Sequence, residues 1–174
     1  EELLVVADYC HPGQVNDSFS GLILFMKLMH ELSRMPKRQY TYRFLFLPET
    51  IGSAVHIAAD PARFDRVIGG VFSEMVAYGD KWYLKATRSG SSYMDLLAGD
   101  VYRTFDDVAH ADFRSYYKND ELMFDSVQVG VPMLALQKYP FAEYHSSNDD
   151  TSRMQPGDLQ HALDVMLHLV DVLE

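Results

Sequence analysis

Several titratable side chains fall where apolar strands end in this sequence, and their types suit a metal site. They are His11, Asp17, Glu49, Glu74 with Asp80 as its alternate, and His145. In open α/β sheets, ligands bind beyond the carboxyl ends of the strands. Nitrogen and oxygen ligands in this mixture suit zinc, which takes three or four of them and can keep one position for a water molecule. The placement therefore predicts a zinc site that acidifies its bound water, with a nearby carboxylate to remove the proton.

Each of these residues also has an explanation that needs no metal. Asp17 stands near the start of a predicted helix, where a capping carboxylate accepts backbone N–H bonds. Glu49 precedes a second helix, Glu74 fits an exposed strand position, and a lone histidine such as His145 is more often only hydrogen-bonded. The joint placement of these residues at strand ends favours a metal site, because none of them indicates a metal by itself.

Strands and helices alternate along the chain and must position these groups. Apolar runs predict strands over 3–9, 40–47, 67–77, 82–87 and 131–136, and we expect the strand over 82–87 to pair with the one over 67–77. Repeats of three and four residues predict helices over 19–32, 51–59, 93–109 and 159–173. The alternation indicates an α/β fold of three layers, α/β/α, around a mixed, mainly parallel sheet.

Length, composition and charge limit the classes of protein to which this chain can belong. A chain of 174 residues that is 48% hydrophobic can bury one sizeable core, so we expect a single domain over 1–174. The formal net charge of −10 disfavours nucleic acid and anionic membrane partners. We find no apolar run of membrane-spanning length and no leader pattern. Because the chain starts directly in a strand, we expect it to be part of a longer protein with further domains.

The single cysteine, Cys10, cannot form a disulfide within the chain. Its place after an apolar run predicts a buried structural thiol. This cysteine usage indicates a reducing compartment and therefore a cytoplasmic protein.

Three motifs, in order, resemble those of the zinc aminopeptidase superfamily. They are His11 with 16–21 (Asn-Asp-Ser-Phe-Ser-Gly), 44–53 (Phe-Leu-Phe-Leu-Pro-Glu-Thr-Ile-Gly-Ser) and 144–146 (Tyr-His-Ser). This superfamily includes leucyl aminopeptidases, glutamate carboxypeptidase II and glutaminyl cyclases. The chain is most similar to a bacterial group of aminopeptidase-like proteins whose domain has no assigned function, and the similarity extends over nearly all of it.

The resemblance implies a role for each matching residue. It implies that His11 binds one zinc, that Asp17 bridges two zincs, and that Glu49 is the catalytic base. A later acid at a strand end, Glu74 or alternatively Asp80, binds the first zinc, and His145 binds the second. Asp120 and Tyr144 are implied to contact the substrate or to orient a ligand, which makes the expected substrate a peptide or an amino-acid amide.

Two residues depart from the superfamily pattern. Thr50 stands where a second glutamate ligand is expected, and Gly13 stands where an aspartate would orient His11. We therefore expect one zinc, with two as the alternative. The predicted function is a zinc-dependent, aminopeptidase-like hydrolase that cleaves a peptide or amide bond. Two alternatives stay open: a non-catalytic binding or scaffold domain on this fold, and an aminoacyltransferase of the glutaminyl cyclase type.

Overall fold

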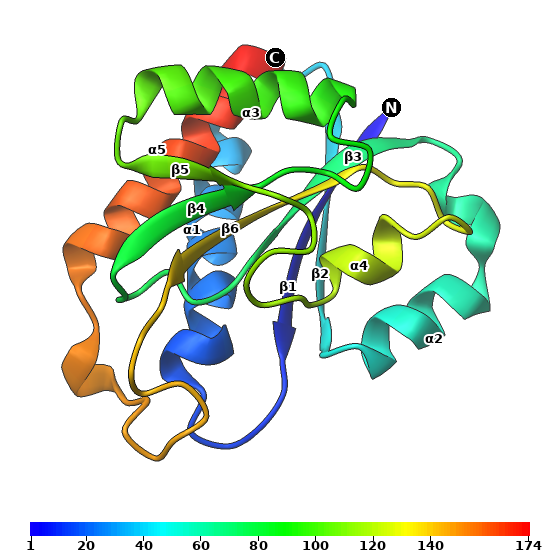
Figure 1. Cartoon of the computed structure of the whole chain (residues 1–174). Helices are drawn as coiled ribbons and strands as arrows, with labels where there is room; N and C mark the ends of the chain where they lie inside the picture. The colour runs from blue at the N-terminus through cyan, green and yellow to red at the C-terminus, as the bar shows by residue number, and fades with distance from the viewer.

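A six-stranded sheet occupies the centre of the computed structural model, which describes residues 1–174 (Figure 1). Its order is β2-β1-β3-β6-β4-β5, and neighbouring strands are parallel except for the antiparallel pair β4 and β6. This arrangement confirms the predicted α/β class with a mixed, mainly parallel sheet. The strands are β1 (Glu2–Tyr9), β2 (Thr41–Pro48), β3 (Val67–Ser73), β4 (Lys81–Lys85), β5 (Val108–Ala111) and β6 (Met133–Tyr139).

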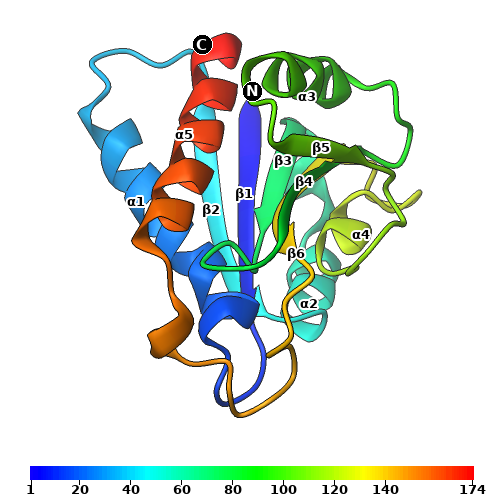
Figure 2. The ribbon, with the colours of Figure 1, turned by 60° about the vertical axis from the view of Figure 1, so that its left-hand side comes forward.

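Helices cover both faces of the sheet, with α1 and α5 on one side and α2 and α4 on the other (Figure 2). None of the helices is both long enough and apolar enough to span a membrane. The helices are α1 (Ser20–Arg34), α2 (Ile51–Ala59), α3 (Tyr93–Thr104), α4 (Glu121–Phe124) and α5 (Pro156–Leu173), with short helical turns at Val15–Phe19, Pro61–Phe64 and Thr151–Arg153.

Strand β1, which lies between β2 and β3, is buried on both faces, as its continuous apolar run predicts. Its side chains alternate between two cores. Leu3 and Val5 belong to the larger core with α1, α3 and α5, whereas Leu4 and Val6 belong to the smaller core on the side of α2 and α4. Side chains of successive strand residues point to opposite faces, so one strand anchors both layers of helices.

Glycine at position 21 allows α1 to lie directly against the end of β3. A Cβ atom at Gly21 would stand 1.9 Å from the Ser73 carbonyl oxygen and 2.7 Å from the Ser73 carbonyl carbon. No other residue fits there without moving the helix. The close approach places the start of α1 beside the residue that follows β3.

Several sequence-based boundaries and one pairing are wrong. The strand expected over 67–77 ends at Ser73, and β4 pairs with β6 and β5, not with β3. The helix expected over 93–109 ends at Thr104, since Phe105 is extended and the chain then enters strand β5. Strand β5 and helix α4 have four residues each, too few for a periodic pattern to show. Strand order depends on contacts distant in sequence, which local patterns do not contain.

Four parallel strands, β2, β1, β3 and β6, end at the same edge of the sheet. In Figure 1 this edge faces down, and the segments that follow β1 and β6 lie there together. Hydrogen bonds from the backbone N–H groups of Asn16 and Asp17 to the Asp149 side chain confirm that the two segments touch. The residues predicted to do chemistry follow these strand ends.

Candidate metal centre

Three of the predicted residues, His11, Asp17 and His145, come together at this edge. Each offers a ligand atom, and these atoms all lie within 4.8 Å of one another. The His145 Nε2 atom is 3.3 Å from Asp17 Oδ2, and the two imidazole rings face each other edge to face, with centroids 5.2 Å apart. Two nitrogen ligands and one carboxylate oxygen at this spacing form a set that suits zinc.

The Asp17 carboxylate shows that this group needs a further partner. Asp17 is buried, and its Oδ2 atom accepts no hydrogen bond. Burial raises the pKa of Asp17, although the neighbouring His11 and His145 oppose the shift. A buried carboxylate oxygen without a hydrogen bond costs free energy, which a cation bound between it and the histidines would recover. The alternative role as a helix cap is not seen, because α1 begins only at Ser20 and has no side-chain cap.

The segment that carries Asp17 is fixed by residues that follow β3 and β6. Asp149 accepts hydrogen bonds from the backbone N–H groups of Asn16 and Asp17, at 2.7 and 3.0 Å, and from the Tyr78 hydroxyl at 2.5 Å. The Asn16 side chain accepts from the N–H of Ala77 and donates to the carbonyl of Tyr78. Within the short helical turn Val15–Phe19, Asp17 itself has non-helical backbone angles, and these bonds hold it facing the two histidines.

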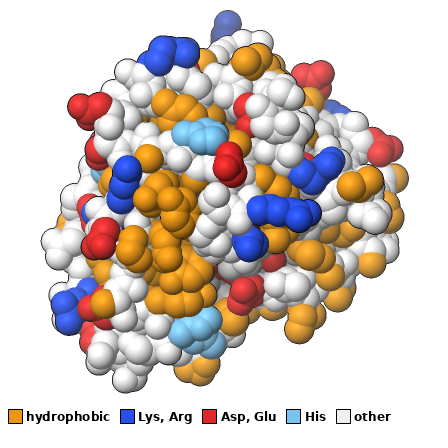
Figure 3. Space-filling model, viewed as in Figure 1, with side chains coloured by type: hydrophobic (Ala, Val, Ile, Leu, Met, Phe, Trp, Pro, Cys, Tyr) orange, Lys and Arg blue, Asp and Glu red, His pale blue; other side chains and the backbone are white.

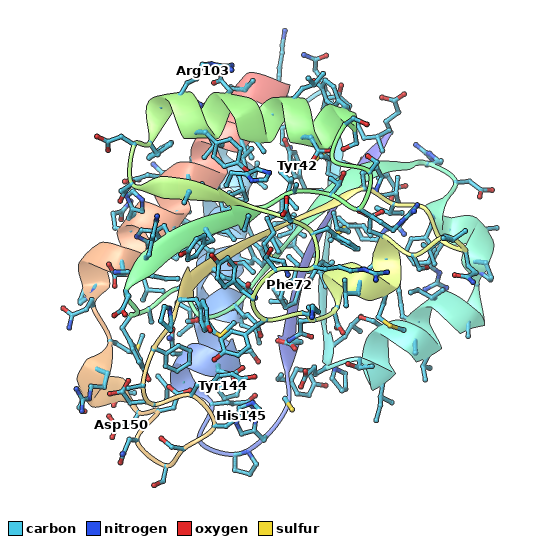
Figure 4. The ribbon with its side chains drawn as sticks, viewed as in Figure 1. Tyr42, Phe72, Arg103, Tyr144, His145 and Asp150 are labelled. Atoms are coloured by element: carbon cyan, nitrogen blue, oxygen red, sulfur yellow. The ribbon has the colours of Figure 1, made fainter.

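His145 is held by aromatic stacking. The Tyr144 ring lies 3.8 Å from the imidazole, with 19° between the planes, and Tyr117 stacks on Tyr144 at 4.1 Å. Figure 4 shows Tyr144 and His145 side by side at the lower edge of the sheet. Burial raises the pKa of Tyr144. Tyr144, which the resemblance implies to contact substrate, thus makes its closest aromatic contact with His145.

His145 is the exposed member of the group of three. Figure 3 shows that hydrophobic side chains gather in the middle of the face viewed in Figure 1. His145 has 60% of its side chain exposed, so the candidate centre opens to solvent on the histidine side.

Glu49, the predicted base, follows β2 and lies next to the segment of His11. Its backbone N–H donates to the Tyr9 carbonyl at 3.0 Å. The Glu49 carboxylate is the main cause that raises the pKa of the Cys10 thiol to about 12, followed by burial. Cys10 is exposed, so the expectation of a buried structural thiol is wrong. Its strand ends one residue earlier, and the side chain emerges beside Glu49.

Asp120 supports the turn that presents Glu49. One carboxylate oxygen accepts from the Thr50 N–H at 2.7 Å, and the other accepts from the Ser53 hydroxyl at 2.7 Å. Thr50 has a φ of 58°, which is rare for a β-branched residue. Burial raises the pKa of Asp120, and the bonds from Ser53 and Thr50 oppose it. Asp120 therefore uses both oxygens to hold the start of α2.

Glu74 and Asp80 lie outside the group of three. Glu74 is 2% exposed, and each of its oxygens accepts one amide hydrogen bond, from Asn119 Nδ2 at 2.9 Å and from Gln137 Nε2 at 2.8 Å. Burial raises the pKa of Glu74 strongly, and the carboxylates of Asp8 and Asp17 add to the effect. Asp80 comes just before β4, and its N–H donates to the Pro140 carbonyl.

Two aspartates at the site were not predicted from the sequence. Asp149 follows His145 by four residues in an Asn-Asp-Asp run, which was the only available signal. Asp8 follows the apolar residues 3–7 of strand β1, and the apolar run gives no signal for it. Asp8 is fully buried and both of its oxygens lack a hydrogen-bond partner. Burial, with Asp120 and Glu49 nearby, raises the pKa of Asp8 to about 7.

Comparison with protein families gives a match over the whole chain. The model of a family described as a domain of unknown function, DUF4910, matches residues 1–174. A curated protein of Clostridium acetobutylicum, named for polysaccharide biosynthesis and an aminopeptidase-like domain, is 29% identical over 177 residues. That alignment covers 100% of this chain and 40% of the relative, so the chain spans less than half of the relative's length.

Solved structures share the fold. A zinc aminopeptidase from Bacillus subtilis superposes with a TM-score of 0.86 at 18% identity, covering 99% of this chain and 46% of that structure. A glutaminyl cyclase from Porphyromonas gingivalis superposes with a TM-score of 0.78 at 14% identity, covering 99% of this chain and 72% of that structure. At these identities the likeness establishes a peptidase-like fold.

Proposed function

This chain belongs to the DUF4910 family, and we propose that it is the catalytic domain of a zinc-dependent hydrolase that cleaves a peptide or amide bond. The observation that carries the proposal is the convergence of His11, Asp17 and His145, with ligand atoms within 4.8 Å of one another. The zinc aminopeptidase of Bacillus subtilis, which has the same fold, supports the choice of metal and reaction.

The residues present fit a single zinc. His11, Asp17 and His145 would hold it, and the Asp17 oxygen that accepts no hydrogen bond would gain a cation. Zinc bound by three protein ligands acidifies a water in its fourth position and polarises a carbonyl group. We propose that Glu74 lies next to the three ligands without binding the zinc itself, because both of its oxygens already accept hydrogen bonds, one from Asn119 and one from Gln137.

The remaining roles belong to the carboxylates around the centre. Glu49 is proposed to take a proton from the attacking water and to pass it to the leaving amine. Asp149 keeps Asp17 in place through its backbone N–H bonds, and the stacked Tyr144 orients His145. A substrate with a free ammonium group suits the concentration of carboxylates at this edge, where Asp8, Glu49 and Glu74 lie near one another.

The substrate class, the rest of the protein and its location are part of the same proposal. The substrate class is a peptide or an amino-acid amide. Because the chain spans 40% of its curated relative, further domains of a longer protein are proposed to contribute to substrate choice. The single cysteine supports a reducing compartment, so a cytoplasmic location is proposed. The Clostridium acetobutylicum relative supports a bacterial source.

A second candidate is an aminoacyltransferase of the glutaminyl cyclase type. The structural likeness to the Porphyromonas gingivalis glutaminyl cyclase favours it, because it covers 72% of that structure. Incubation of the zinc-loaded protein with a peptide that starts with glutamine separates the two reactions. Release of the first residue supports the hydrolase, whereas a product that keeps all residues and lacks ammonia supports the cyclase.

The first experiment measures zinc per chain by elemental analysis. Wild type and His30→Ala, an exposed histidine of α1, are expected to hold about one zinc, while His11→Ala and His145→Ala lose it. Glu49→Gln is expected to keep zinc and to lose turnover by about 10²- to 10⁴-fold. A wild-type chain that binds no zinc when zinc is supplied would refute the hydrolase. Two zincs per chain would refute the single-metal centre.

A further inference from the structure

Lys85 on β4 forms a fully buried ion pair. Its ammonium group donates to Glu121 Oε1 at 2.5 Å and to the Tyr117 carbonyl at 2.6 Å. Relative exposure of the two charged side chains is 0% for Lys85 and 1% for Glu121. A buried ion pair of this kind adds little net stability, because desolvation of both charges offsets their attraction. The pair therefore calls for an explanation other than stability.

Both partners of Lys85 belong to one short segment, residues 117–121. Glu121 extends the link within that segment, since its second oxygen accepts from the Asn119 N–H at 3.0 Å. The segment leads into α4, which has only four residues. With so little regular structure of its own, the segment depends on side-chain bonds for its conformation, and Lys85 supplies two of them.

The same segment touches three parts of the candidate centre. Asn119 donates from Nδ2 to Glu74 Oε2 at 2.9 Å. Asp120 holds the backbone of Thr50, the residue after Glu49, at 2.7 Å. Tyr117 stacks on Tyr144, which stacks on His145. One buried ammonium group thus fixes a segment that contacts the surroundings of Glu74, Glu49 and His145.

We propose that Lys85 is a positioning residue of the metal centre, acting through residues 117–121. The inference rests on the proposed function, since it assigns Lys85 a part in organising that centre. Lys85 bonds to Tyr117 and Glu121 and acts on the ligands only through them. Partners bonded directly to a ligand typically change metal affinity by about 10- to 100-fold when they are lost, and Lys85 acts one step further away, so we expect the lower end of that range.

The test compares two pairs of neutral substitutions. Lys85→Met combined with Glu121→Gln removes both buried charges, so no unpaired charge is left behind. The matched control is Lys138→Met combined with Asp158→Asn, because Lys138 on the adjacent strand β6 forms a 2.7 Å ion pair with Asp158 on α5. The single variant Lys85→Met shows the cost of leaving Glu121 unpaired, and if it fails to fold, the double variant decides.

Two readouts are measured on the full chain. One is zinc affinity, which is expected to fall about tenfold in the Lys85/Glu121 double variant and to stay at the wild-type value in the control. The other is hydrogen exchange of the Thr50 N–H in metal-free protein, relative to the Leu136 N–H in the centre of the sheet. Protection of Thr50 is expected to fall in the Lys85/Glu121 double variant only, because the Asp120 side chain is no longer held.

The outcomes separate this inference from the proposed function. Unchanged zinc affinity and unchanged Thr50 protection in a folded Lys85/Glu121 double variant would overturn the positioning role. Equal losses in the control would overturn it too, since they would reflect general destabilisation. If the wild type binds no zinc, the proposed function fails, and the exchange measurement still decides whether Lys85 holds the segment.

Discussion

Asp8→Asn is predicted to stabilise the protein at neutral and alkaline pH and to leave it nearly unchanged in acid. Asp8 is fully buried at the end of β1, and neither carboxylate oxygen has a hydrogen-bond partner. Burial raises the pKa of Asp8 from 3.8 to about 7, and the carboxylates of Asp120 and Glu49 add to it. Asparagine has nearly the same shape and carries no charge to desolvate.

The size and sign follow from linkage between protonation and folding. A carboxyl group whose pKa rises on folding favours the folded state below the unfolded value of 3.8, and this advantage is lost as the pH rises through about 7. At about 1.4 kcal/mol per pKa unit, the loss amounts to up to about 4 kcal/mol. The free energy of unfolding of Asp8→Asn minus that of wild type should therefore grow by this amount between pH 4 and pH 8.

Urea denaturation of both proteins at a series of pH values measures this difference, with a chelator present so that no metal ion alters the local charge. Asp95→Asn is the control of opposite sign. Burial alone would raise the pKa of Asp95, but hydrogen bonds from Thr87 and Ser92 outweigh it and hold the pKa below its usual value. Asp95→Asn should therefore be less stable than wild type at pH 7, and the difference should disappear as the pH falls below about 4. A difference between Asp8→Asn and wild type that is the same at pH 4 and pH 8 would refute the reasoning.

Two further predictions concern packing and the support of Asp17. Gly21→Ala should destabilise the fold by about 3 kcal/mol or more, because the new Cβ overlaps the Ser73 carbonyl. The control Gly157→Ala should be neutral or stabilising, because a Cβ there meets nothing within 4 Å. Thermal unfolding compares the two variants, and equal melting temperatures would contradict the close approach of α1 to β3. Asp149→Asn should lower the free energy of unfolding by about 1 to 3 kcal/mol, because the amide group cannot accept all three hydrogen bonds that the carboxylate accepts. It should also lower zinc affinity about tenfold. An unchanged affinity in a zinc titration would argue against the support of Asp17 by Asp149.

The elements with strong local patterns could be predicted from the sequence. The apolar repeat of α1 and the apolar run of β1 gave elements close to those observed, and the alternation of strands and helices predicted the right class. The predicted pairing of β4 with β3 was wrong, because the antiparallel partner of β4 is β6, which lies about fifty residues later in the chain. Period and composition describe short stretches and contain no information on such contacts.

The candidate site was predictable to the extent that its residues follow strand ends. His11, Asp17 and His145 were grouped for that reason, and the structure brings them together. Asp149 could not be singled out, because its role consists of bonds to backbone N–H groups more than one hundred residues away. The same limit applies to Lys85, which reads as an ordinary strand lysine until its burial is known.

The bonds from Asn16 and Asp17 to Asp149 also bear on the order of folding. They join positions 133 and 132 residues apart, so almost the whole chain must be arranged before the Asp17 segment has its native shape. Contacts this distant in sequence form late, because the entropy of closing the loop must be offset by structure already made. A chain emerging from the ribosome would thus acquire its ligand geometry only after the segment beyond β6 has been synthesised. For the zinc centre proposed above, metal uptake would then follow the formation of these long-range contacts and would distinguish molecules that have made them from those that have not.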